Sequence, residues 1–129
     1  MGQVLVVDDE DVLLEMIVAL VDDLGYKSLV ATNGDEALHV LHDQSEPPAL
    51  IISDVMMPKM NGVELLESLQ SSSQYNHIPF ILMSAAGRPS NAHGESFFLH
   101  KPFSIDTLIE LIDRYAGGKQ VRQSGSCSG

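Results

Sequence analysis

Asp54 is the residue that best suits covalent chemistry in this sequence. It follows a short apolar run, residues 50–53, and Pro58 soon afterwards prevents a strand from continuing. Such a run is typical of a buried strand in a parallel sheet, and open α/β sheets bind ligands at the carboxyl ends of their strands. We therefore expect Asp54 at that edge of a sheet, as a carboxylate that can act as a nucleophile and accept a phosphoryl group.

Polar side chains also end three other apolar runs: Asp8 and Asp9 the first, Ser84 the fourth and Lys101 the fifth. Clustered carboxylates without His or Cys favour Mg²⁺. Mg²⁺ can neutralise the charge of a transferring phosphoryl group, and Lys101 can pair with one of its oxygens. Ser84 adds a hydroxyl donor. Core packing does not require these residue types at strand ends, so the set predicts a phosphoryl-transfer site.

Strands and helices must alternate to bring these residues together. The apolar runs predict strands at residues 4–7, 26–31, 50–53, 78–83 and 97–100. The segments after the first, second, third and fifth strands have apolar residues at helical spacing. Asn33 and Ser104 are expected helix N-caps, and Gly25 is expected to end the first helix. This order predicts an α/β layer fold with a parallel sheet and right-handed crossovers.

Composition limits the class of protein. The 129 residues suffice for one domain, and 44% of them are hydrophobic. The net charge of −11 argues against direct nucleic-acid binding or attachment to an anionic membrane through a basic surface. The one Cys permits no internal disulfide, and we expect a cytoplasmic protein without a signal peptide or membrane span. We expect a domain over residues 1–116 and a disordered tail or linker over residues 117–129.

The ordered set of strand-end residues resembles the response-regulator receiver domains (the CheY-like family) of two-component phosphorelays. The residues that carry the resemblance are Asp8-Asp9, Asp54, Met57-Pro58, Gly62, Ser84-Ala85 and Lys101-Pro102-Phe103. It covers residues 3 to about 116. It implies a flavodoxin-like, doubly wound, five-stranded parallel sheet with strand order 2-1-3-4-5.

The resemblance also implies a role for each matching residue. Asp54 would be the phosphoacceptor, and Mg²⁺ would be bound by Asp9, Asp54 and the backbone carbonyl of Met56, with Asp8 acting through water. The remaining roles concern the phosphorylated state: Ser84 would be the switch hydroxyl, Lys101 the phosphate-pairing lysine with a cis bond to Pro102, and Phe98 the switch aromatic residue.

One feature departs from the family pattern. Only 17 positions separate Ser84 from Lys101, where family members usually place a helix of several turns. Gly87, Pro89 and Gly94 oppose a regular helix in this segment. We therefore expect a shortened or missing fourth helix, which leaves open how the protein signals to an output partner.

We interpret the chain as a phosphorylation-dependent switch that receives its phosphoryl group from a histidine kinase or a histidine phosphotransfer protein. Apart from its own Mg²⁺-dependent phosphorylation and dephosphorylation, we expect no enzymatic activity. A phosphohydrolase with an Asp nucleophile would need a second carboxylate soon after Asp54, where Val55-Met56-Met57 stand. A phosphate-independent interaction module stays open because of the short crossover. The chain also fits a piece of a hybrid kinase or of a regulator with an output domain.

Overall fold

The fold alternates strands and helices along the chain. The structure, a computed structural model, describes residues 2–85 and 96–117. The strands are β1 (Gln3–Val7), β2 (Lys27–Ala31), β3 (Leu50–Asp54), β4 (Phe80–Ser84) and β5 (Ser96–His100). The helices in the described part are α1 (Asp11–Asp23), α2 (Gly34–Asp43), α3 (Gly62–Gln70) and α4 (Ile105–Ala116).

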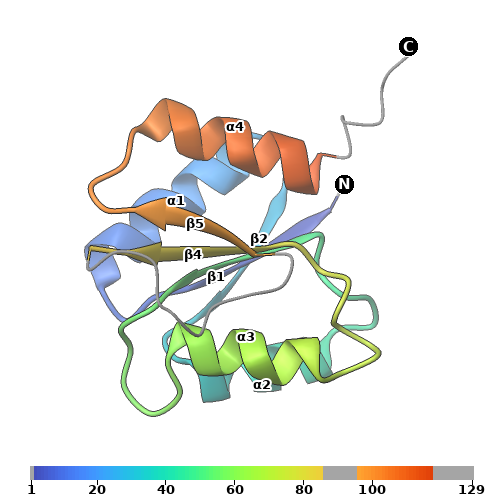
Figure 1. Ribbon diagram of the computed structural model, residues 1–129. Coiled ribbons are helices and arrows are strands. Elements are labelled where there is room, and N and C mark those ends of the chain that lie inside the picture. The colour runs from blue at the N-terminus through green and yellow to red at the C-terminus, as the bar shows by residue number, and fades with distance from the viewer. Residues whose placement is uncertain (1, 86–95, 118–129) are drawn as a thin grey trace.

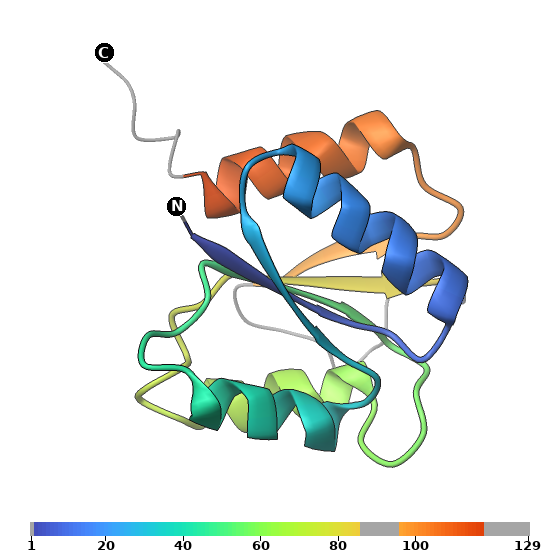
Figure 2. The same cartoon turned by 180° about the vertical axis from the view of Figure 1, so that it is seen from behind.

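The strands form one parallel sheet in the order β2-β1-β3-β4-β5. Helices α1 and α4 cover one face and α2 and α3 the other, so the sheet lies between two helical layers (Figure 1). The view from behind shows the same layering (Figure 2). The predicted sheet order and α/β class are confirmed.

Each face of the sheet carries its own apolar core because successive residues of a strand point to opposite faces. Leu5, Ile51 and Leu82 pack with α2 and α3, whereas Val6, Ile52 and Ile81 pack with α1 and α4. The central strand β3 is buried along its whole length. The residues that follow the strands are therefore fixed by packing on both sides.

Side-chain caps define where three helices begin. The side chains of Asn33 and Ser104 accept hydrogen bonds from the first turns of α2 and α4, as predicted. Helix α3 begins with a reciprocal capping box between Asn61 and Glu64. This box ends the loop that follows Asp54, so the start of α3 fixes one end of that loop.

All five strands differ slightly from their predicted bounds: β1 and β5 each begin one residue earlier, and β3 and β4 each end one residue later. Strand β4 begins at Phe80 instead of residue 78, and β2 begins at Lys27 instead of residue 26. Pro79 has no N–H to donate, and only its carbonyl joins the ladder, accepting from Ile51 N at 3.0 Å. The predictions of a shortened or missing fourth helix and of a disordered tail concern residues 86–95 and 118–129, which lie outside the described residues.

Within the described residues, no helix is both long enough and apolar enough to cross a membrane.

Candidate functional site

The sheet register brings the predicted residues to one edge. Val7 pairs with Ser53, and Ser84 pairs with His100. The next residue after Val7 is Asp8 and the next after His100 is Lys101, so both lie beside Asp54 at the carboxyl ends of the strands. These neighbours come from segments far apart in the sequence, as the topology predicts.

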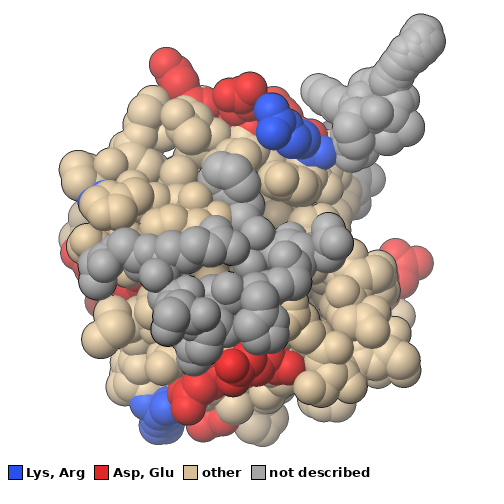
Figure 3. Space-filling view, viewed as in Figure 1, with Lys and Arg blue, Asp and Glu red and all other residues tan. Residues whose placement is uncertain are grey.

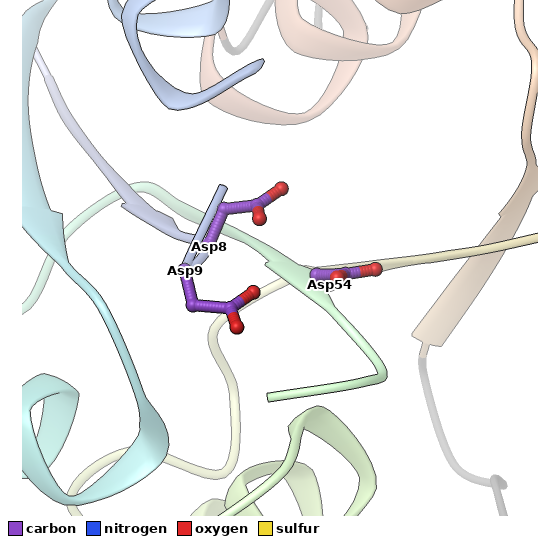
Figure 4. A group of neighbouring side chains, drawn as sticks. All are labelled: Asp8, Asp9 and Asp54. Carbon is purple, nitrogen blue, oxygen red and sulfur yellow. The ribbon is translucent and has the colours of Figure 1, made fainter. Parts of the chain in front are cut away.

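Asp8, Asp9 and Asp54 form a compact carboxylate cluster. Each offers an oxygen, and these oxygens all lie within 4.8 Å of one another. Figure 4 shows the first two at the end of β1 and the third on β3, with their carboxylates grouped together. Asp8 is fully buried and Asp54 is 7% exposed, whereas Asp9 is exposed. The cluster therefore opens to solvent on the side of Asp9.

Asp8 carries the clearest sign of an expected cation. Its Oδ1 accepts a hydrogen bond from the Glu10 N–H at 2.9 Å, but its buried Oδ2 has no hydrogen-bond partner among the described residues. Burial is the largest cause that raises the pKa of Asp8 to about 6, and the negative charge of Asp54 adds to it. A divalent cation would offset both effects, so the donor set fits Mg²⁺.

Lys101 pairs directly with the proposed phosphoacceptor. Its Nζ lies 3.1 Å from Asp54 Oδ1, and the side chains are 20% and 10% exposed, respectively. The peptide bond between Lys101 and Pro102 is cis, as expected. The Lys101 N–H donates to the Ser84 carbonyl at 2.9 Å, which fixes the lysine beside the end of β4. Ser84 itself is buried there.

The loop between Asp54 and α3 is closed at its base by close backbone contacts. The Gly62 N–H donates to the Val55 carbonyl at 3.0 Å, and the Ser53 hydroxyl donates to the Asp54 carbonyl at 2.9 Å. A Cβ on Gly62 would overlap the Asp54 carbonyl oxygen, so only glycine fits. Met56, at the start of this loop, has a side chain that is 70% exposed.

Phe98 lies on the opposite side of β5 from Leu99. It is partly buried and packs against the core under α2 and α3. Its ring meets that of the exposed His100 edge-on, with centroids 6.4 Å apart. The side chain of Phe97 lies outside the described residues.

A largely apolar groove of about 460 Å³ adjoins the site. It lies between the first half of α1 and the segment that joins β5 to α4. Its lining residues are Glu10, Val12, Leu13, Met16, Ala85, Lys101, Pro102, Phe103 and Ile105. Val12 is 78% exposed and Ile105 is 42% exposed, so apolar side chains of the groove face solvent.

The structure brings together Asp8, Asp9, Asp54, Ser84 and Lys101, all of which sequence reasoning selected. Sequence reasoning did not select Ser53, whose hydroxyl donates a hydrogen bond to the Asp54 carbonyl. The one available signal was a polar residue inside an otherwise apolar run. The groove was also missed, because its lining comes from separate segments that no sequence pattern joins.

Comparison with known proteins identifies these features as those of a family. The family model described as the response regulator receiver domain matches residues 4–113. A response regulator from Synechocystis is 34% identical over 123 residues, which cover 91% of this chain. The chain spans about half of that relative's length, 52%.

Solved structures agree with these matches. The signal receiver domain of a histidine kinase from Syntrophus aciditrophicus has a TM-score of 0.82 at 29% identity, over 98% of this chain and 96% of that one. The receiver domain of a Pseudomonas aeruginosa sensor histidine kinase has a TM-score of 0.78, over 90% of this chain and 98% of the other. At 22% identity this second likeness concerns the fold alone, and that structure has a magnesium ion coordinated in its active-site cleft.

Proposed function

The chain belongs to the response regulator receiver domain family, and from this premise we propose that it is a switch controlled by phosphorylation of Asp54. The observation that carries the proposal is the ion pair between Lys101 Nζ and Asp54 Oδ1 beside two further carboxylates. An ordinary surface ion pair needs no buried acidic neighbours. A phosphoryl-transfer site needs the lysine for the phosphoryl group and the neighbouring carboxylates for Mg²⁺.

The phosphoryl group would come from a phosphohistidine on a histidine kinase or a histidine phosphotransfer protein. An Asp54 oxygen attacks phosphorus, a P–O bond forms, and the P–N bond to histidine breaks while the departing imidazole takes up a proton. Slow hydrolysis by water returns phosphate and the free carboxylate. The chain catalyses only these two steps, on itself, and passes the signal to an output protein or domain.

Lys101 and Ser84 would read the phosphorylated state. In the unphosphorylated protein Lys101 neutralises Asp54. After transfer its ammonium pairs with a phosphoryl oxygen, and the Ser84 hydroxyl donates to another. Phe98, which borders the core under α2 and α3, would follow Ser84 inward. Two conformations separated by a small free energy suffice for such a switch.

Asp9, Asp54 and the Met56 carbonyl would hold Mg²⁺, with Asp8 acting through water. When bound, Mg²⁺ supplies positive charge that holds the phosphoryl oxygens and lowers repulsion from the carboxylates. The buried Asp8 Oδ2, which no described residue hydrogen-bonds, supports this assignment. Residues 1–116 would form the receiver domain, and the single Cys suits a reducing cytoplasm.

The test is the intact mass of the protein after incubation with Mg²⁺ and a small acyl-phosphate donor. We expect one phosphoryl adduct that requires Mg²⁺ and is absent from Asp54→Asn. Asp35→Asn, which removes an exposed carboxylate in the first turn of α2, is the matched control and should still give the adduct. A folded wild-type protein that neither binds Mg²⁺ nor gains the adduct would instead be a phosphate-independent interaction module.

The apolar groove beside Lys101 is where the phosphodonor protein would dock. It is continuous with the site because Ala85 and Lys101 line it. An apolar face of a partner helix placed there would bury the exposed Val12 and bring a phosphohistidine next to Asp54. We expect Val12→Asp to slow transfer from a phosphorylated histidine phosphotransfer protein at least about tenfold, as for a charged residue placed in an interface centre.

The same variant should react normally with the small acyl-phosphate donor, because the Asp54 site is intact. Val30→Asp, an equivalent change at another exposed apolar position, is the control and should leave both reactions unchanged. Equal slowing with both donors would place the effect of Val12 in the chemistry instead of in docking.

A further inference from the structure

Gly34, the first residue of α2, makes an unusually close contact with the loop that follows Asp54. Its N–H donates to the Met60 carbonyl at 2.8 Å. A Cβ at this position would lie 2.5 Å from Met60 Cγ, 2.7 Å from Met60 Cβ and 2.8 Å from the Met60 carbonyl oxygen. Real side chains do not approach so closely, so a larger residue here must displace either α2 or the loop.

The loop, residues 55–61, is held at its ends and by its side chains: Val55 is buried in the core, and Met57 and Met60 pack against that core. Its base is closed by the hydrogen bond from Gly62 N to the Val55 carbonyl at 3.0 Å. Near its tip, Lys59 has a φ of 62°, a left-handed conformation that a lysine seldom adopts. A residue holds such a conformation only when its surroundings impose it. The hydrogen bond from Gly34 to the Met60 carbonyl comes one residue later and fixes the backbone near this tip.

We propose that Gly34 is a positioning residue for the phosphorylation site. Gly34 acts through Met60 and the loop to hold the Met56 carbonyl in place for Mg²⁺. The inference rests on the proposed function, in which Asp54 and the Met56 carbonyl bind Mg²⁺ together. Gly34 itself touches neither the cation nor the phosphoryl group.

The first test measures Mg²⁺ affinity by calorimetric titration of wild-type and Gly34→Ala proteins. Loss of a residue that orients a metal ligand typically weakens binding 10- to 100-fold, so we expect about tenfold weaker binding. Gly117→Ala is the matched control, because its Cβ would lie 2.5 Å from the Asp113 carbonyl oxygen at the far end of α4. It should lower stability and leave the Mg²⁺ affinity unchanged.

A second-site change separates positioning from damage to the fold. Met60→Gly removes the two side-chain atoms closest to the added methyl group. The double variant Gly34→Ala/Met60→Gly should therefore bind Mg²⁺ more tightly than Gly34→Ala alone. No recovery, or equal weakening by Gly117→Ala, would overturn the inference.

The wild-type protein provides a test that needs no variant. Coupling between two sites is reciprocal, so Mg²⁺ should slow hydrogen exchange of the Gly34 amide by about the factor that the contact contributes to Mg²⁺ binding. The amides of Ala37, bonded to the Asn33 carbonyl, and Gly117, bonded to the Asp113 carbonyl, are internal controls. Nuclear magnetic resonance would report all three.

The outcomes distinguish this inference from the proposed function. If the wild type shows no Mg²⁺-dependent shift at any amide, the proposed metal site fails. If Mg²⁺ binds but the Gly34 amide exchanges as fast as before, the positioning role is wrong, whatever Gly34→Ala does to folding. Slower exchange at Gly34, with Ala37 and Gly117 unchanged, supports it.

Discussion

The three carboxylates of the site differ because of where the fold places them. Residue type and spacing alone make Asp8 and Asp9 equivalent neighbours after a strand. In the structure Asp8 is fully buried, and one of its oxygens has no hydrogen-bond partner in the described part of the chain, whereas Asp9 is exposed. A buried carboxylate resists ionisation, and an exposed one does not. Asp8 therefore carries an electrostatic cost of grouping the three carboxylates.

We expect Asp8→Asn to stabilise the protein at pH 7.5 in the presence of a chelator. Below pH 3.8 the Asp8 carboxyl is neutral in both the folded and the unfolded protein. Between pH 3.8 and about 6 it ionises in the unfolded chain but not yet in the folded protein, so the wild type loses stability as pH rises. The difference in pKa corresponds to at most about 3 kcal/mol in the free energy of unfolding. Urea unfolding from pH 4 to 8 measures this quantity.

The advantage of Asp8→Asn should shrink towards zero near pH 4. Asp9→Asn removes an exposed carboxylate and should change stability by less than about 0.5 kcal/mol. An Asp8→Asn protein less stable than the wild type at pH 7.5 would mean that the buried carboxylate is compensated by contacts other than a cation.

At the scale of elements, local patterns predicted more than long-range contacts. The caps at Asn33 and Ser104 and the strand ends at Asp54 and Ser84 follow from residue types and periodicity, and the structure has them. The start of β4 was placed too early because Ile78 fits a strand in any local window, although Pro79 cannot donate to the ladder.

Contacts between distant segments were not predictable, because propensity and periodicity extend over only about one element. The contact of Gly34 with Met60 is one example, and the hydrogen bond from the Tyr26 hydroxyl to Asp113 Oδ1, at 3.1 Å, is another. Tyr26 lies just before β2 and Asp113 near the end of α4, so this bond ties the last described helix to the far edge of the sheet.

Tyr26→Phe should therefore lower the free energy of unfolding by about 1 kcal/mol, the typical contribution of one such bond. Burial, together with the bond to Asp113, raises the pKa of Tyr26. Above pH 10 the Tyr26 hydroxyl therefore ionises in the unfolded chain before it does so in the folded protein. The wild type loses stability there, and the difference in the free energy of unfolding between the wild type and Tyr26→Phe becomes smaller. Chemical unfolding at pH 7 and pH 10.5 tests both points.

Tyr115→Phe is the matched control, because the structure gives the Tyr115 hydroxyl no hydrogen bond within the described residues. Its effect should stay below about 0.5 kcal/mol at either pH. If the two variants lose equal stability, the Tyr26–Asp113 bond contributes nothing specific.

The whole molecule is strongly acidic, with a net charge of −11. On the face seen in Figure 3, acidic side chains gather over α3 and α4. Any cation would therefore stabilise the fold to some degree by screening repulsion between these charges. A specific Mg²⁺ effect must exceed that general one and must depend on the cluster at the strand ends.

We expect Mg²⁺ at ten times its dissociation constant to raise the free energy of unfolding by about 1.4 kcal/mol, the value for one site that exists only in the folded state. Sodium chloride of equal ionic strength should give a smaller rise, since it acts only by screening. Asp9→Asn should respond equally to both salts: Asp9 is exposed, so the variant folds, but it lacks a ligand of the cluster. Thermal unfolding of both proteins in each salt measures the difference. If Asp9→Asn keeps the full Mg²⁺ response, the cation binds to the acidic surface instead of at the carboxylate cluster.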